Sequence, residues 1–189
     1  MKVIKAKTAG FCFGVKRAVD TVYKQVDTKC GQIYTYGPII HNEEVIKDMR
    51  DKGVIVLRSE EDLDMISQGT VIIRSHGVEK RIYEKIEQKG LRIVDATCPF
   101  VKKIHNIVSE KSGEGFHIII IGNPEHPEVV GIKGWAKDNV TVIQSAEDAE
   151  CFTADRKEKI CIVSQTTFNY NKFKDLVEII SEKGYDISC

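Results

Sequence analysis

The chain of 189 residues lacks three features that would place it in a specialised class of protein. It has no excess charge, since 28 Lys and Arg residues are matched by 28 Asp and Glu residues. We therefore expect no nucleic-acid partner, and any anion site must be local. No apolar run approaches the roughly 20 residues of a membrane span. The first residues also lack a hydrophobic stretch of signal-peptide length, so we expect a cytoplasmic protein without a membrane partner.

Paired cysteines are also missing. None of the six cysteines forms a Cys-x-x-Cys pair, so their spacing gives no zinc-ribbon or ferredoxin signature. A single cysteine in a reducing compartment is more often a small buried hydrophobe than a ligand, and we assign that role to Cys161 in its apolar run. Cys12 and Cys98 differ because each stands where a loop enters a predicted helix, whose N-terminus favours the thiolate form.

Five short apolar runs are present, and each is followed by a small-residue turn that carries a chemically active side chain. Strands that alternate with helices predict an α/β fold with parallel sheets. Because ligands bind beyond the carboxyl ends of parallel strands, we expect these turns to build one shared site. The five runs are 32–36, 71–73, 91–94, 118–121 and 160–163.

Apolar periodicity and glycine stops predict the remaining elements. Two further strands are expected over 54–57 and 140–143. The predicted helices are 15–26, 43–52, 60–66, 79–89, 100–111, 129–136 and one after Thr167 that stops at Gly184.

An internal duplication relates the two halves of the chain. Four landmarks recur at offsets of 85 to 90 residues: Cys12 with Cys98, His41 with His126, 54–62 with 140–148, and His76 with Thr166. A period this long indicates a duplicated domain rather than a solenoid unit of about 20–50 residues. We therefore predict two pseudo-symmetric modules, 1–97 and 98–189, each with a small parallel sheet flanked by helices.

Three histidines share one placement. His41, His76 and His126 each follow a Gly- or Ser-containing turn at a strand end, where backbone N–H groups also collect. Imidazole groups there suit a diphosphate ligand, because they can become cationic beside phosphate. Any one of them alone is as easily an unrelated surface histidine, and the shared placement favours function. His105 and His117 lack this placement and are interpreted as structural.

Two further turns carry candidate proton-transfer groups. Glu128 stands two residues after His126, and a buried carboxyl group beside phosphate can donate a proton. The alternative is an ordinary acidic residue in the first turn of a helix. Gln165 and Thr166 at a strand end offer amide and hydroxyl hydrogen bonds, although a helix N-cap explains the Thr equally well.

Six motifs occur in this order along the chain: Gly10-Phe11-Cys12-Phe13-Gly14, Gly37-Pro38-Ile39-Ile40-His41-Asn42, Arg74-Ser75-His76-Gly77, Asp95-Ala96-Thr97-Cys98-Pro99, Glu125-His126-Pro127-Glu128 and Ser164-Gln165-Thr166-Thr167. As a set they resemble the LytB/IspH family of 4-hydroxy-3-methylbut-2-enyl diphosphate reductases. The resemblance implies reductive dehydroxylation of that diphosphate to isopentenyl and dimethylallyl diphosphates, in the methylerythritol phosphate route to isoprenoids.

The resemblance also implies a role for each candidate residue. A 4Fe-4S cluster would be held by three cysteines, with one iron open to the substrate and a ferredoxin or flavodoxin as electron donor. The implied roles are cluster ligands for Cys12 and Cys98, diphosphate binding for His41, His76 and His126, catalytic proton donation for Glu128, and substrate binding within the proton relay for Thr166.

The chain departs from the family in its length. Family members have a third related module, which completes a trefoil and supplies the third cysteine. We expect an incomplete fragment that is inactive alone, with Cys189 or a residue beyond the end as the third ligand. The alternative from another class is a non-catalytic α/β module that binds a phosphorylated metabolite through its histidines. A zinc hydrolase is less favoured, because no His-x-x-x-His pair exists.

Overall fold

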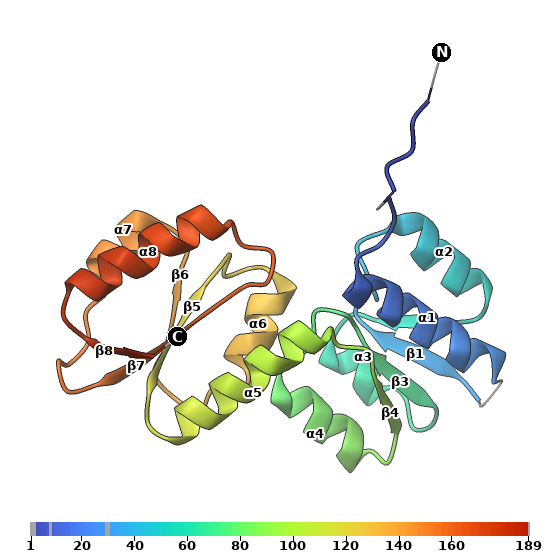
Figure 1. The fold of residues 1–189 in the computed structure, drawn as a ribbon. Coiled ribbons are helices and arrows are strands. Elements are labelled where there is room, and N and C mark those ends of the chain that lie inside the picture. The colour runs from blue at the N-terminus through green and yellow to red at the C-terminus, as the bar shows by residue number, and fades with distance from the viewer. Residues whose placement is uncertain (1–2, 8, 29–30, 189) are drawn as a thin grey trace. The chain divides into compact units, whose positions relative to one another are not determined.

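The structure is a computed structural model that describes residues 3–7, 9–28 and 31–188 (Figure 1). Contacts divide the chain into two compact units. Unit 1 comprises Met1–Ser75 and Gly90–Cys98, and unit 2 comprises His76–Lys89 and Pro99–Cys189. Among the described residues, no helix combines the length and the apolar character that crossing a membrane requires.

Unit 1 contains a parallel four-stranded sheet with the strand order β2-β1-β3-β4. Its strands are β1 (Ile33–Tyr36), β2 (Ile55–Leu57), β3 (Thr70–Ile73) and β4 (Arg92–Asp95). In the register, Tyr34 of β1 lies beside Ile55 of β2 and Val71 of β3. All four residues of β3 are buried, which is typical of a central strand in a parallel sheet with both faces covered.

The helices α1 (Phe13–Asp27) and α2 (Glu43–Asp51) pack on one face of this sheet. Ala18 and Val22 of α1 join Met49 of α2 in a cluster with Ile33 and Ile72 of the strands. The apolar stripe predicted over 15–26 therefore faces a core, as expected of an amphipathic helix. The short helix α3 (Glu60–Asp64) follows β2.

Unit 2 repeats the same strand order, β6-β5-β7-β8. Its strands are β5 (His117–Ile121), β6 (Val140–Ile143), β7 (Lys159–Ser164) and β8 (Asp186–Ser188). Ile118 and Ile120 of β5 pack with α5 (Pro99–Gly113) and α6 (Pro127–Lys133). Ile119 and Ile121 pack on the opposite face with α7 (Ala146–Cys151) and α8 (Tyr170–Glu182). The predicted α/β class with parallel sheets flanked by helices is confirmed.

The segment His76–Lys89, with helix α4 (Lys80–Gln88), connects two strands of unit 1 but groups with unit 2. Its Tyr83 ring contacts the Trp135 ring edge-on at 5.7 Å between centroids. The predicted boundary between residues 97 and 98 lies one residue from the last passage between the units. The sequence did not predict that this segment, which joins two strands of unit 1, would belong to unit 2.

Two elements were not expected from the sequence. Helix α7 buries only Ala149, so its residues show no apolar stripe. Strand β8 has three residues, none of them fully buried, and gives no apolar run. The predicted helix over 129–136 begins instead at Pro127, because proline fits the first turn of a helix, and ends at Lys133.

Candidate functional site

Cys12 and Cys98 both belong to unit 1 and lie at the same end of α1. Cys12 is the exposed N-cap residue of this helix, and Cys98 is half-buried. A β-carbon added at Gly14 would lie only 2.5 Å from Cys98 Sγ. Gly14 therefore leaves the space that the sulfur of Cys98 occupies, two residues beyond Cys12. Both thiols are free, and the two cysteines lie near the N-terminus of the same helix.

The turn that carries Cys98 is fixed from several directions. Arg17 of α1 donates from Nη1 to the carbonyl of Thr97 at 2.8 Å and from Nη2 to that of Asp95 at 3.3 Å. The Cys98 N–H donates to the carbonyl of Ser75 at 2.9 Å, and the Asp95 carboxylate accepts from the Thr97 N–H at 2.9 Å. Because the polar backbone groups of this turn are satisfied, Cys98 is held in place rather than displayed on a loose loop.

His41 is exposed in the turn between β1 and α2, also in unit 1. Ser75 anchors this turn, because its Oγ and its N–H donate to the Ile39 carbonyl at 3.0 and 3.3 Å. On the other side, Asn42 caps α2 by accepting the Val45 N–H at 3.0 Å. The backbone around His41 is therefore fixed while its imidazole remains accessible.

Arg74 is a charged residue of unit 1 that sequence reasoning noted only as part of a motif. Burial lowers the pKa of its guanidinium group from the ordinary value, while the nearby Tyr36 acts in the opposite direction. Gly37 has a φ of +74°, which favours glycine, and a β-carbon there would lie 2.5 Å from Arg74 Nη1. A partly buried positive charge thus lies beside the turn that leads to His41. In the sequence, the position of Arg74 between a buried strand and the Ser75-His76 pair was the signal that could have identified it.

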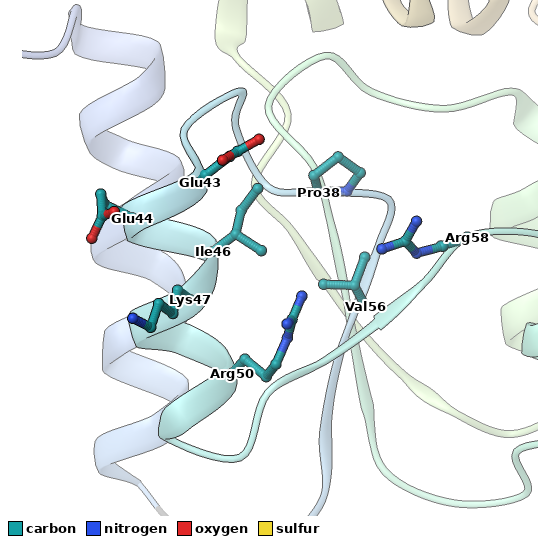
Figure 2. A pocket seen from close by; sticks show the side chains of 8 residues that line it. All are labelled: Pro38, Glu43, Glu44, Ile46, Lys47, Arg50, Val56 and Arg58. Atoms are coloured by element: carbon teal, nitrogen blue, oxygen red, sulfur yellow. The ribbon is translucent and has the colours of Figure 1, made fainter.

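A hollow of about 470 Å³ lies elsewhere on unit 1, between α2 and the edge strand β2 (Figure 2). Arg50 of α2 and Arg58 after β2 extend into it beside the apolar side chains of Ile46 and Val56. Its remaining lining is Pro38, Glu43, Glu44 and Lys47. None of the predicted site residues lines this hollow, so it is separate from the candidate site.

Glu128 of unit 2 is a buried carboxylate, with 1% of its surface exposed. Its Oε1 accepts the Thr166 N–H at 2.6 Å, and its Oε2 accepts the Thr166 hydroxyl at 2.8 Å. Glu128 lies in the first turn of α6, and Thr166 follows β7 and is exposed. The hydroxyl of Thr166 therefore connects a buried acid to the surface, as a proton relay requires.

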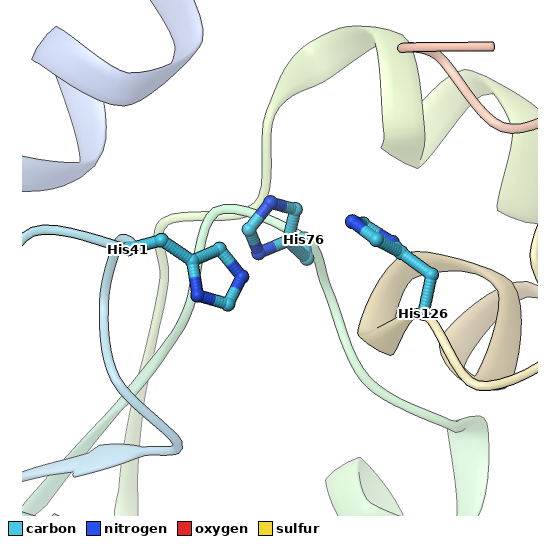
Figure 3. Close-up of side chains that lie close together, drawn as sticks. All are labelled: His41, His76 and His126. Carbon is cyan, nitrogen blue, oxygen red and sulfur yellow. The ribbon is translucent and has the colours of Figure 1, made fainter.

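His126 and His76 lie together in unit 2 (Figure 3). His126 is the N-cap of α6, and its Nδ1 accepts the Glu128 N–H at 3.2 Å. A backbone amide can only donate, so the neutral ring carries its own proton on Nε2. The ring of His76 packs edge-on against that of His126, with centroids 5.3 Å apart and planes at 90°. Two imidazoles and the start of a helix are therefore gathered beside Glu128.

Asn123 was missed by sequence reasoning, and it shapes the turn that carries His126. Its side chain accepts the Glu125 N–H at 2.9 Å, and its carbonyl accepts the His126 N–H at 3.0 Å. Gln165 ties this turn to β7, because its Oε1 accepts the Asn123 N–H at 3.2 Å. Its amide also donates to the Thr167 hydroxyl at 2.8 Å. The signal that could have identified Asn123 is its position directly after a strand and a glycine, since Asn is common in such turns.

The other described cysteines and histidines have different surroundings, and Cys30 lies outside the described residues. Cys161 is buried in the core of unit 2, as predicted, and Cys151 is exposed at the end of α7. His105 stacks on Trp135, and His117 contacts the Thr141 hydroxyl at 2.8 Å. Cys189, the predicted alternative for a third ligand, lies outside the described residues.

The family described as LytB protein matches residues 3–189 of the chain. Two curated relatives are both named 4-hydroxy-3-methylbut-2-enyl diphosphate reductase. The chain is 44% identical over 188 residues to the one from Caldanaerobacter subterraneus subsp. tengcongensis and 47% identical over 189 residues to the one from Thermoanaerobacter sp. strain X514. Each comparison covers 99% of this chain and 65% of the relative. The chain thus spans about 65% of the length of these relatives.

Solved structures give the same likeness. One is titled as the E-1-hydroxy-2-methyl-but-2-enyl-4-diphosphate reductase from Plasmodium falciparum. It matches with a TM-score of 0.88 at 29% identity, over 96% of this chain and 57% of that one. Another is titled as (E)-4-hydroxy-3-methyl-but-2-enyl diphosphate reductase, the terminal enzyme of the non-mevalonate pathway. Its TM-score is 0.81 at 37% identity, over 98% of this chain and 65% of that one.

Proposed function

This chain belongs to the LytB protein family, and we propose that it supplies the diphosphate-binding and proton-donating groups of a 4-hydroxy-3-methylbut-2-enyl diphosphate reductase. The observation that carries the proposal is the buried Glu128 carboxylate, held at both oxygens by Thr166 beside two histidines. The names of the relatives support this substrate.

In the proposed reaction, the bond between the allylic carbon and its hydroxyl oxygen breaks and a carbon–hydrogen bond forms. Two electrons and two protons are consumed, and the hydroxyl group leaves as water. The products are isopentenyl and dimethylallyl diphosphates, which differ in the carbon that receives the proton. We propose a ferredoxin or flavodoxin as the electron source and the cytoplasm as the location.

Glu128 is the proposed proton donor. Its carboxyl group is shielded from bulk water, with 1% of its surface exposed, while Thr166 is exposed. A hydroxyl group both donates and accepts, so Thr166 can pass the proton that it donates to Glu128 Oε2 while its oxygen accepts another from the exposed side. This arrangement would deliver protons singly and keep water away from the reacting carbon.

The histidines are the proposed ligands of the diphosphate. His126 offers an Nε2–H donor, because its Nδ1 is occupied by the Glu128 N–H. His76 lies against the same ring, and His41 is exposed on unit 1. Hydrogen bonds to the diphosphate would fix the far end of the substrate and so orient its hydroxyl group.

Cys12 and Cys98 are the proposed ligands of a 4Fe-4S cluster. Such a cluster needs three cysteines, and Cys12 and Cys98 would supply two of them. Both thiols are free, both residues lie at one end of α1, and Gly14 leaves room for a sulfur atom. When bound, the cluster would supply the electrons and an open iron as Lewis acid. We propose that the third ligand and the third module of the trefoil lie outside the described residues. We therefore propose that the chain is inactive alone.

The test is anaerobic iron–sulfur reconstitution of the chain and of three variants. We expect a brown protein whose iron and sulfide contents fall strongly in Cys12→Ser and in Cys98→Ser. Cys151→Ser is the matched control, because Cys151 is exposed and lies in no motif, and it should retain both. Calorimetry with inorganic diphosphate should show binding that weakens in His126→Ala. A colourless protein that still binds diphosphate would instead support the non-catalytic module.

A further inference from the structure

Helix α6 carries functional groups at one end and structural contacts at the other. His126 and Glu128 stand at its N-terminus, while Gly134 and Trp135 follow its C-terminus. The helix has only seven residues, Pro127–Lys133, so these two groups are about 10 Å apart along its axis. A displacement of the C-terminal end would therefore move the N-terminal end by a similar amount.

The C-terminal end of α6 is attached to the segment that carries His76. Trp135 donates from Nε1 to the carbonyl of Val78 at 2.9 Å, two residues beyond His76. Gly134 accepts the Lys80 N–H at 3.4 Å. A β-carbon at Gly134 would lie 2.4 Å from the Cβ of Glu79, so the two backbones approach as closely as glycine allows.

Trp135 is itself fixed by two rings of unit 2. His105, with 1% of its surface exposed, stacks on the indole with centroids 5.0 Å apart and planes at 18°. Tyr83 of α4 packs edge-on against the Trp135 ring, with centroids 5.7 Å apart. An indole held in this way has little rotational freedom, so its N–H keeps one direction.

We propose that Trp135 is a positioning residue that sets the spacing between His76 and His126. Both ends of the histidine pair depend on it: His126 through the short helix α6, and His76 through the hydrogen bond to Val78. The edge-on contact of the two imidazoles at 5.3 Å is the geometry that this attachment maintains. The inference rests on the proposed function, since it assigns the pair to diphosphate binding.

The experiment measures binding of inorganic diphosphate to the whole chain by calorimetry, together with ¹H–¹⁵N spectra of the histidine rings. Trp135→Phe keeps an aromatic ring on His105 but removes the N–H donor, and we expect three- to ten-fold weaker binding, the worth of about one hydrogen bond. The ring signals of His76 and His126 should also shift. Gly134→Ala perturbs the same attachment independently, by pushing on Glu79. The matched control is Val130→Ala, because Val130 is 41% exposed on the same helix.

If Trp135 were purely structural, Trp135→Phe would lower the free energy of unfolding but leave the diphosphate affinity of the folded protein unchanged. That result, with His76→Ala and His126→Ala still weakening binding, would overturn the inference and leave the proposed function intact. If His76→Ala and His126→Ala bind diphosphate as tightly as the unaltered chain, the proposed function fails, and the inference fails with it.

Discussion

At the scale of single residues, Thr166 donates a hydrogen bond to each carboxylate oxygen of Glu128. Thr166→Val keeps the backbone N–H but removes the hydroxyl that donates to Oε2 at 2.8 Å. The buried oxygen would then lose its donor, and we expect the free energy of unfolding to fall by about 1–3 kcal/mol. Thr166→Ser retains a hydroxyl and should recover most of this loss. Urea unfolding of both variants measures the difference, and equal stabilities would contradict the assigned role of the hydroxyl.

A second residue prediction concerns the space in front of Cys98. An alanine in a helix is ordinarily favoured over glycine by about 1 kcal/mol. Gly14→Ala should nevertheless destabilise the chain, because the added carbon would lie 2.5 Å from Cys98 Sγ and must displace it. We also expect a faster reaction of Cys98 with iodoacetamide, measured by mass spectrometry, and a lower iron content after reconstitution.

The control for this substitution is Gly113→Ala. Gly113 lies in helix α5, and a β-carbon there would meet nothing within 4 Å. This variant should be as stable as the unaltered chain or slightly more stable. Unchanged Cys98 reactivity in Gly14→Ala would show that the sulfur is not held against the helix.

Sequence reasoning could find Cys12 and Cys98, because the duplication places both at helix starts. It could not find the role of Arg17. The guanidinium of Arg17 contacts carbonyl groups 78 and 80 residues away, and no local pattern in one sequence reveals such a pair. The same limit applies to Trp135 and Val78, which are 57 residues apart.

At the scale of elements, the duplication reappears in how two short helices begin. In unit 1, Asp62 accepts the Arg58 N–H at 2.7 Å and Ser59 accepts the Asp62 N–H at 3.3 Å. In unit 2, Asp148 and Ser145 make the equivalent contacts ahead of α7. In unit 2 the serine and the aspartate cap the helix reciprocally, because Asp148 also accepts the Ser145 N–H at 3.0 Å. Helix α7 was missed because this cap, and not an apolar stripe, stabilises its start.

This cap gives a pH-dependent prediction. Hydrogen bonds from the backbone N–H groups of Gln144 and Ser145 lower the pKa of Asp148. Since the folded-state pKa is below the unfolded one, the stabilisation is complete above about pH 4 and is lost as pH falls through the lowered value. Asp148→Ala should therefore cost about 1 kcal/mol of unfolding free energy at pH 7 and less at pH 3.

The comparison for Asp148 is Glu147→Ala, which removes an acid from the same helical turn without removing a cap. Its effect should be smaller at pH 7 and should not follow the same pH profile. Thermal unfolding at both pH values gives the answer, and a constant difference between Asp148→Ala and the unaltered chain would contradict the assignment.

Strands were the elements that the sequence predicted best, for a physical reason. A strand covered on both faces needs a continuous apolar run, and β5 meets this need with four consecutive isoleucines. Glu128, in the first turn of the helix after β5, and Thr166, just after β7, lie beyond the carboxyl ends of parallel strands, as predicted. Strand β8 gave no such signal because it is short and incompletely buried.

At the scale of the whole molecule, the chain passes between the two units three times, at residues 75–76, 89–90 and 98–99. Unit 2 is therefore not a continuous piece of sequence. Helix α4 belongs to it by its contacts, although α4 precedes the strand β4 of unit 1. A cut at the end of unit 1 would leave residues 99–189 without the segment that contacts Trp135.

Two fragments test this interlocking, and the single tryptophan of the chain reports on both. Residues 76–189 keep the hydrogen bond from Trp135 to Val78 and the packing of Tyr83, whereas residues 99–189 lose both. A hydrogen bond contributes about 0.5–1.5 kcal/mol, and an aromatic pair contributes about 0.5–1.5 kcal/mol beyond the area that it buries. We therefore expect the longer fragment to be more stable in urea by about 1–3 kcal/mol, and the shorter one to show red-shifted fluorescence. Equal stability and equal emission would mean that α4 contributes nothing to unit 2, and that the chain divides at residue 98 alone.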